Sequence, residues 1–80
     1  MEGAPIDLTE ERLKRKFIEI VNDHIYFYNE CPAIHKAYHQ NAIASHQTTA
    51  TVFGWDDVAK EICDQCNAIW ADVKPNPISI

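Results

Sequence analysis

The sequence predicts an all-α fold in which three helices form a single domain. Two long segments, one from Leu13 to Tyr28 and one from Trp55 to Val73, carry apolar residues at steps of three and four, which is the spacing of one face of an α-helix. A shorter segment between them has a weaker pattern of the same kind. The chain has 80 residues, and a domain of this size buries only roughly 60–65% of the surface that its unfolded form exposes. Help from a partner or from a second copy is therefore expected.

The first helix is expected from about Glu10 to about His24, after an N-terminal tail of residues 1–8. Thr9 is a residue type that favours the N-cap position, because its hydroxyl oxygen accepts a hydrogen bond from one of the free backbone N–H groups of the first turn. Leu8 and Leu13 occupy the two positions of a hydrophobic staple. Together these signals predict that the helix starts at residue 9.

A corner is expected at Ile25–Pro32, where three aromatic residues precede a proline, because the residue before proline is biased away from helix. His24 would then cap the end of the first helix, and a pH-sensitive contact is the alternative role for this side chain. A second, weaker helix is expected from Ala33 to about Ala44. Ser45–Thr51 is polar, β-branched and without period, which predicts a loop. The inward stripe of the second helix would consist of Ile34, Ala37, Tyr38 and Ala42.

The third helix is expected to begin near Thr51 to Gly54 and to end before Pro75, since proline cannot continue a helix. Trp55–Val73 contains no glycine or proline, and its apolar residues stay in phase, so this segment predicts one helix of about nineteen residues. Residues 75–80 are expected to form a C-terminal tail. The helical domain is therefore bounded at residues 9–74.

Charge and composition favour protein partners over nucleic acid. Seven Lys and Arg residues stand against twelve Asp and Glu residues, which gives a net charge of −5 and an isoelectric point near 5.1, and such a chain repels a polyanion on average. The three cysteines show no pairing scheme and no signal peptide precedes the fold, so a reducing intracellular compartment is expected. No apolar run reaches the roughly 18 residues of a membrane span, which predicts a soluble protein without membrane contact.

Several apolar and aromatic motifs follow one another in a definite order. They are Phe17-Ile18 with Val21, the segment His24–Asn29, Tyr38, the segment Trp55–Ala59 and the segment Cys66–Lys74. Their order resembles that of the MADF domain, a Myb/SANT-like module of transcription and chromatin factors, over about residues 13–74. The resemblance implies a three-helix, non-enzymatic domain of a nuclear protein that takes part in transcription regulation or chromatin.

Two departures from the MADF pattern change the expected partner. The family separates its second and third helices by a short turn, whereas the corresponding motifs here lie in one uninterrupted pattern. Residues 55–73 also contain five acidic residues and one basic residue, a local charge of −4, while a helix that reads the major groove needs phosphate-neutralising Lys and Arg. The last helix is therefore expected to bind protein, and DNA binding by this domain alone is not expected.

A merged last helix is expected to leave its C-terminal half unable to fold back onto the first helix of its own chain. Its apolar stripe would then be buried against a second copy that exchanges the equivalent helix, or in a hydrophobic groove of a partner protein. The sequence thus predicts a protein–protein interaction module that binds a partner, a second copy in a swapped dimer, or both. The expected partner-binding residues are Ile62, Cys66, Ile69, Trp70 and Val73.

Two other functions are kept as alternatives. One is a MADF-type sequence-specific DNA-binding domain, which would use Arg12, Arg15 and Lys16 of the first helix together with the loop at residues 45–51. The other is a small acidic viral or phage protein that inhibits another protein by occupying its site.

No catalytic residue and no cofactor are expected, because a nucleophile such as Cys31 is accompanied by no Gly-rich turn and no third orienting residue. The other two thiols, Cys63 and Cys66, have with His35 and His39 the residue types of a zinc site. The C-x-x-C motif lies within a helical pattern, however, and Cys66 falls on the apolar stripe, where cysteine behaves as a small hydrophobe. No bound metal is expected, and zinc on these four residues is left as an open alternative.

Overall fold

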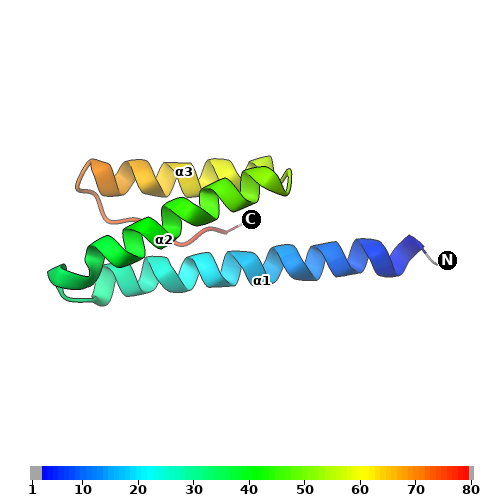
Figure 1. The fold of residues 1–80 in the computed structure, drawn as a ribbon, viewed down its shortest axis with the longest axis horizontal. Coiled ribbons are helices and arrows are strands. Elements are labelled where there is room, and N and C mark those ends of the chain that lie inside the picture. Colours follow the sequence, from blue (N-terminus) through cyan, green and yellow to red (C-terminus); the bar gives the residue numbers. More distant parts are fainter. Residues whose placement is uncertain (1–2, 80) are drawn as a thin grey trace.

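The computed structural model describes residues 3–79, with side chains described from residue 9 onward. Three helices make up most of this part of the chain, which confirms the all-α prediction: α1 spans Gly3–Glu30, α2 spans Ala33–Val52 and α3 spans Asp56–Trp70. Each helix runs antiparallel to the one before it (Figure 1). Because α2 packs against both α1 and α3, it is the central element of the molecule, which measures 50 × 19 × 18 Å.

The N-terminal half of α1 starts earlier than the sequence predicted. The helix begins at Gly3, so Thr9 lies inside it and is not its N-cap, and the Leu8 side chain of the expected staple lies outside the described residues. Glu10 Oε2 accepts a hydrogen bond of 3.3 Å from Trp55 Nε1, beside the turn between α2 and α3. The part of α1 before Glu10 projects past this turn with no helix alongside it (Figure 1). We call this part the α1 overhang.

The C-terminal half of α1 also runs on, through the aromatic residues of the expected corner to Glu30. The constraint from Pro32 acts only on the residue directly before it, Cys31, so it does not stop the helix any earlier. Cys31 N–H donates to Phe27 O at 2.8 Å and completes the last turn. His24 therefore lies well inside α1, and the prediction that it caps the helix end is wrong.

The helix α2 continues to Val52, so the prediction of a loop at residues 45–51 is also wrong. The hydroxyls of Thr49 and Thr51 donate to the carbonyls of the residues four positions earlier, at 3.1 and 3.0 Å, and this satisfies them without a turn. Ile43 and Ala50, seven residues apart, are fully buried. The expected inward stripe faces elsewhere: Ile34, Ala37 and Tyr38 are exposed and Ala42 is only half-buried.

The turn into α3 depends on Gly54, whose φ of +80° is a conformation that glycine adopts at little cost. From Asp56 to Trp70 the helix is uninterrupted, which confirms the prediction of one helix without an internal turn. It ends three residues before the expected Val73. Asp72 takes a φ of +60°, and the N–H groups of Asp72 and Val73 donate to Ile69 O and Ala68 O at 3.0 and 2.7 Å, which is the hydrogen-bond pattern of a Schellman motif.

The core draws on all three helices and on the segment after α3. Within α1 and α3 the core residues recur at steps of three and four, which is why the sequence predicted the apolar stripes of these two helices. The buried residues are Val21 and Ile25 of α1, Ile43 and Ala50 of α2, Trp55, Val58, Ala59, Ile62 and Ile69 at and within α3, and Ile78 beyond it.

Residues 74–79, which we call the C-terminal strap, are not the free tail that the sequence predicted. The strap runs back along α1 in an extended conformation (Figure 1), and Pro75 and Ile78 are buried. The Asn22 side-chain amide donates to Ile78 O at 3.0 Å and accepts from Ile78 N–H at 2.7 Å, while Asn29 Nδ2 donates to Pro75 O at 3.1 Å. Residue 80 lies outside the described part. The strap thus packs on α1 beside α2 and is held there by the two asparagines of α1.

The closed core removes the reason for a swapped dimer. The inner stripe of α3 was expected to need burial against a second copy, but α3 packs on α2 of its own chain and its Ile62 and Ile69 are buried there. A single chain therefore satisfies the apolar face of its last helix.

Candidate interaction surface

The five predicted partner-binding residues fall into two groups. Ile62 and Ile69 are buried and Cys66 is half-buried against the core, so these three are not available to a partner in this structure. Trp70 is 78% exposed and Val73 is 58% exposed. The prediction of an exposed stripe is thus wrong for its inner members, and the surface reduces to the C-terminal end of α3.

The exposure of Trp70 follows from its place on the helix. Successive residues of an α-helix are rotated by about 100°, so when Ile69 points into the core, Trp70 points to the side. Trp70 is also the last residue of α3, and the chain turns away directly after it. No ring contact is found for Trp70 among the described residues, whereas Trp55 stacks on Phe53 at 4.8 Å and contacts Phe17 at 5.5 Å.

A shallow groove of about 280 Å³ lies between α2 and α3, and Trp70 forms part of its wall. Most of the other side chains are amides and thiols, which supply both hydrogen-bond donors and acceptors. The lining residues are Gln40, Asn41, Ala44 and Gln47 of α2 with Cys63, Cys66, Asn67 and Trp70 of α3. We call the groove together with Val73 the α3 surface. The sequence did not indicate the α2 residues, because Gln40, Asn41 and Ala44 lie off the expected inward stripe and Gln47 falls in the expected loop.

Cys66, one of the two thiols of the groove, is a poor nucleophile in this setting. Burial, and to a lesser extent the neighbouring Cys63, raise the pKa of the Cys66 thiol, which disfavours the thiolate that reacts. Asn67 Nδ2 donates to Cys63 Sγ at 3.9 Å, a long and weak contact. Cys66 therefore acts as a small packing group against the core.

The open zinc alternative is not supported by the arrangement of its four residues. Within the described part of the chain, no three His, Cys, Asp or Glu side chains come together in a way that could hold a metal ion. The ring of His39 lies against His24 of α1, whereas Cys63 and Cys66 lie on α3. The C-x-x-C pair and the histidine pair are therefore separated.

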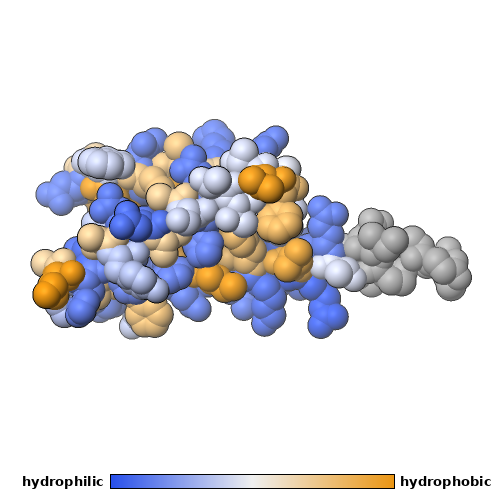
Figure 2. Space-filling view, in the orientation of Figure 1, coloured by the Kyte–Doolittle hydropathy of each residue, from blue (hydrophilic) through white to orange (hydrophobic). Residues whose placement is uncertain are grey.

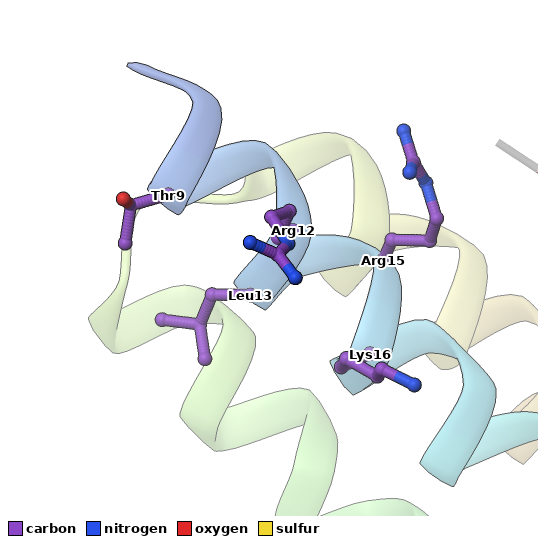
Figure 3. A pocket seen from close by; sticks show the side chains of 5 residues that line it. All are labelled: Thr9, Arg12, Leu13, Arg15 and Lys16. Atoms are coloured by element: carbon purple, nitrogen blue, oxygen red, sulfur yellow. The ribbon is translucent and has the colours of Figure 1, made fainter. Parts of the chain in front are cut away.

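The residues of the DNA-binding alternative lie at the base of the α1 overhang. Arg12, Arg15 and Lys16 surround a shallow hollow with Thr9 and Leu13, and their charged ends fan out in different directions (Figure 3). Lys16 pairs with Glu19 at 3.6 Å, and no carboxylate pairs with Arg12 or Arg15 among the side chains described. The loop that was to assist them is part of α2.

An apolar patch lies next to this basic group. Val52, Phe53 and Leu13 are all exposed, and Leu13, Phe53 and Trp55 share a shallow groove at the α2–α3 turn. Hydrophobic side chains gather on this part of the visible face, with hydrophilic ones around them (Figure 2).

None of the helices in residues 3–79 combines the length and the apolar character needed to cross a bilayer. No protein-family model, no curated protein and no solved structure matches this chain. The geometry of its surfaces and the MADF-like motif order are therefore what a functional proposal rests on.

Proposed function

We propose that this chain is a non-enzymatic protein–protein interaction module that binds its partner through the α3 surface. The observation that carries the proposal is Trp70, a large aromatic residue held 78% exposed at the wall of a groove rich in amide groups. Exposing such a side chain to water is unfavourable, and tryptophan is enriched among the residues that dominate binding energy at protein interfaces. The C-terminus of α3, which ends in a hydrogen-bonded Schellman motif, holds this side chain on a regular helix.

The chemistry around Trp70 indicates the kind of partner. Of the acids that give residues 55–73 a charge of −4, Asp64 and Asp72 lie toward the C-terminal end of this segment, and they favour a partner with basic groups around an apolar anchor. One acid of this region, Asp64, is partly neutralised by Lys60 at 3.4 Å, and Asp72 is exposed. The amides of the groove would hydrogen-bond to polar side chains or backbone of a segment that lies along it, as an amphipathic helix does.

A nuclear setting in transcription or chromatin is part of the proposal. Its support is the motif order that resembles that of the MADF family, and the acidic last helix is the reason to assign this chain a protein partner instead of DNA.

Trp70→Asp tests the proposal, with Val52→Asp as the matched control. Both residues end a helix, Val52 is 79% exposed, and both substitutions add one negative charge. Proteins retained from nuclear extract by the immobilised wild-type chain should also be retained by Val52→Asp and lost with Trp70→Asp. Removal of a central tryptophan typically costs about 2 kcal/mol or more of binding energy, which is a roughly thirtyfold loss of affinity. Retention of the same proteins by all three chains would contradict the proposal.

A second measurement uses the two tryptophans of the chain. In Trp55→Phe, Trp70 is the sole indole fluorophore, and its emission should be that of a solvated indole. Contact with a partner, or with a second copy as concentration rises, should shift the emission to shorter wavelength. An emission that is already blue-shifted at high dilution would mean that Trp70 is not exposed.

MADF-type DNA binding is the second candidate, and the observation that favours it is the pair of exposed arginines, Arg12 and Arg15, for which no carboxylate partner is found among the side chains described. Binding to duplex DNA at low salt, weakened by Arg12→Gln with Arg15→Gln, would support this candidate. The absence of binding at low salt, where counterion release favours association most, would end it.

A further inference from the structure

Three of the four histidines of the chain meet where α1 packs on α2. His24 of α1 faces His39 and His46 of α2, which lie seven residues apart and thus on the same face of their helix. The Nδ1 atoms of His24 and His39 are 3.3 Å apart, and the ring centres of His24 and His46 are 5.4 Å apart. We call these three residues the histidine cluster.

Aromatic rings surround the histidine cluster on both helices. The edge of Phe17 meets His46 at 5.3 Å, Phe27 stacks on His39 at 5.8 Å, and Tyr38 approaches His24 at 6.4 Å. The charged groups that act on the cluster are also histidines: His24 and His35 act on His39, and His24 acts on His46. No carboxylate is among the groups that act on His39 or His46 in the described part of the chain.

The contact between His24 and His39 limits how many protons the histidine cluster can hold. A hydrogen bond between two Nδ1 atoms needs a proton on one of them and a lone pair on the other. Two neutral rings meet this requirement, and so does a pair that shares one extra proton. When both rings are protonated, two donors and two positive charges face each other at 3.3 Å, and the contact becomes repulsive.

We propose that the histidine cluster is an acid-sensitive latch, which holds α1 against α2 near neutral pH and releases them in mildly acidic solution. The latch lies at the α1–α2 interface and does not depend on the α3 surface or on the function proposed for it. Its release would uncover the face of α1 that carries Val21 and Ile25, both fully buried when the helices are packed.

The sign of the effect follows from proton linkage. Burial first, and the neighbouring histidines second, hold the pKa of His39 and of His46 below the ordinary histidine value of 6.5. The unfolded chain therefore binds more protons than the folded chain as the solution is acidified. The stabilisation is complete above the ordinary pKa and is lost as the pH falls through the lowered values. For each proton taken up, the unfolding constant rises up to about tenfold per pH unit.

Urea unfolding of the full chain, followed by far-UV circular dichroism at about pH 7.5 and about pH 5, tests the proposal. The wild-type midpoint should fall markedly at the lower pH. His24→Asn with His39→Asn places an amide near each Nδ1 position without a titrating group, so this variant should lose much less between the two pH values. His35→Asn, at an exposed position of α2, should lose nearly as much as the wild type, because His35 is the smallest of the three influences on His39. An equal loss in the double variant, or no loss in the wild type, would overturn the proposal.

An NMR titration of the wild-type histidines decides the matter if the double variant does not fold. Two of the four ring resonances should titrate at lower pH than a histidine in an unstructured peptide. Four unshifted titrations would show that no latch exists.

Discussion

Asn22 connects two segments that are 56 residues apart, because its side-chain amide makes both hydrogen bonds to the backbone of Ile78. Asn22→Ala removes the two bonds and leaves the N–H and C=O groups of Ile78 without a partner beside a buried side chain. At about 1 kcal/mol of net stability for each bond the loss is about 2 kcal/mol, and the better helix propensity of alanine returns about 0.6 kcal/mol. The expected net loss is about 1.5 kcal/mol.

Thermal unfolding measured by circular dichroism tests this value. For a domain of this size, a loss of about 1.5 kcal/mol corresponds to a fall in Tm of about 6–12 °C. Asn29→Ala, which removes a single bond to Pro75 O, should lower Tm by about a quarter as much, because one lost bond less the gain in helix propensity leaves about 0.4 kcal/mol. Asn41→Ala, at an exposed position of α2, should leave Tm unchanged or raise it slightly. If Asn22→Ala unfolds at the same temperature as Asn41→Ala, the strap does not stabilise the fold.

Two further predictions concern titrating groups. Hydrogen bonds from the Lys14 side chain and from Val58 N–H hold the pKa of Asp57 below its usual value. The contribution of Asp57 to stability is therefore present above the usual Asp pKa and is lost as the pH falls through the lowered value. Lys14→Met should raise the Asp57 pKa in a carboxyl NMR titration, whereas Lys16→Met, which removes the partner of Glu19, should not. Because burial raises the pKa of the Cys66 thiol, iodoacetamide should alkylate Cys66 more slowly than a free thiol in the same buffer, and peptide mass spectrometry would contradict this by finding equal rates.

The buried apolar faces of α1 and α3 could be predicted from the sequence, since they depend on the spacing of residues within one helix. Val21 and Ile25 of α1 and Ile62 of α3 lie on the predicted apolar faces and are buried. Helix boundaries could not be read in the same way. Residues 45–51 are helical and their Thr49 and Thr51 hydroxyls bond back to the same helix, although the same residue types usually favour turns.

The candidate site was predictable only in part, because its exposure depends on contacts between elements. The sequence placed Trp70 on the last helix, where the structure also has it, but the sequence could not show that Ile69 would take the inward position and turn Trp70 outward. The hydrogen bonds from Asn22 and Asn29 to the strap join residues more than forty positions apart, and no local sequence pattern predicts such a pairing. The meeting of His24 with His39 depends in the same way on how α1 and α2 pack.

The hydrogen bonds between α1 and the strap determine which positions relatives of this chain are expected to share. Asn22 and Asn29 bond to backbone atoms only, so the identities of the exposed residues 76, 77 and 79 are free to drift as long as an apolar side chain stands at position 78. Homologues would then share two asparagines seven positions apart on a long first helix, while their residues at these strap positions look unrelated. A search that weights those two positions is the one we expect to detect them.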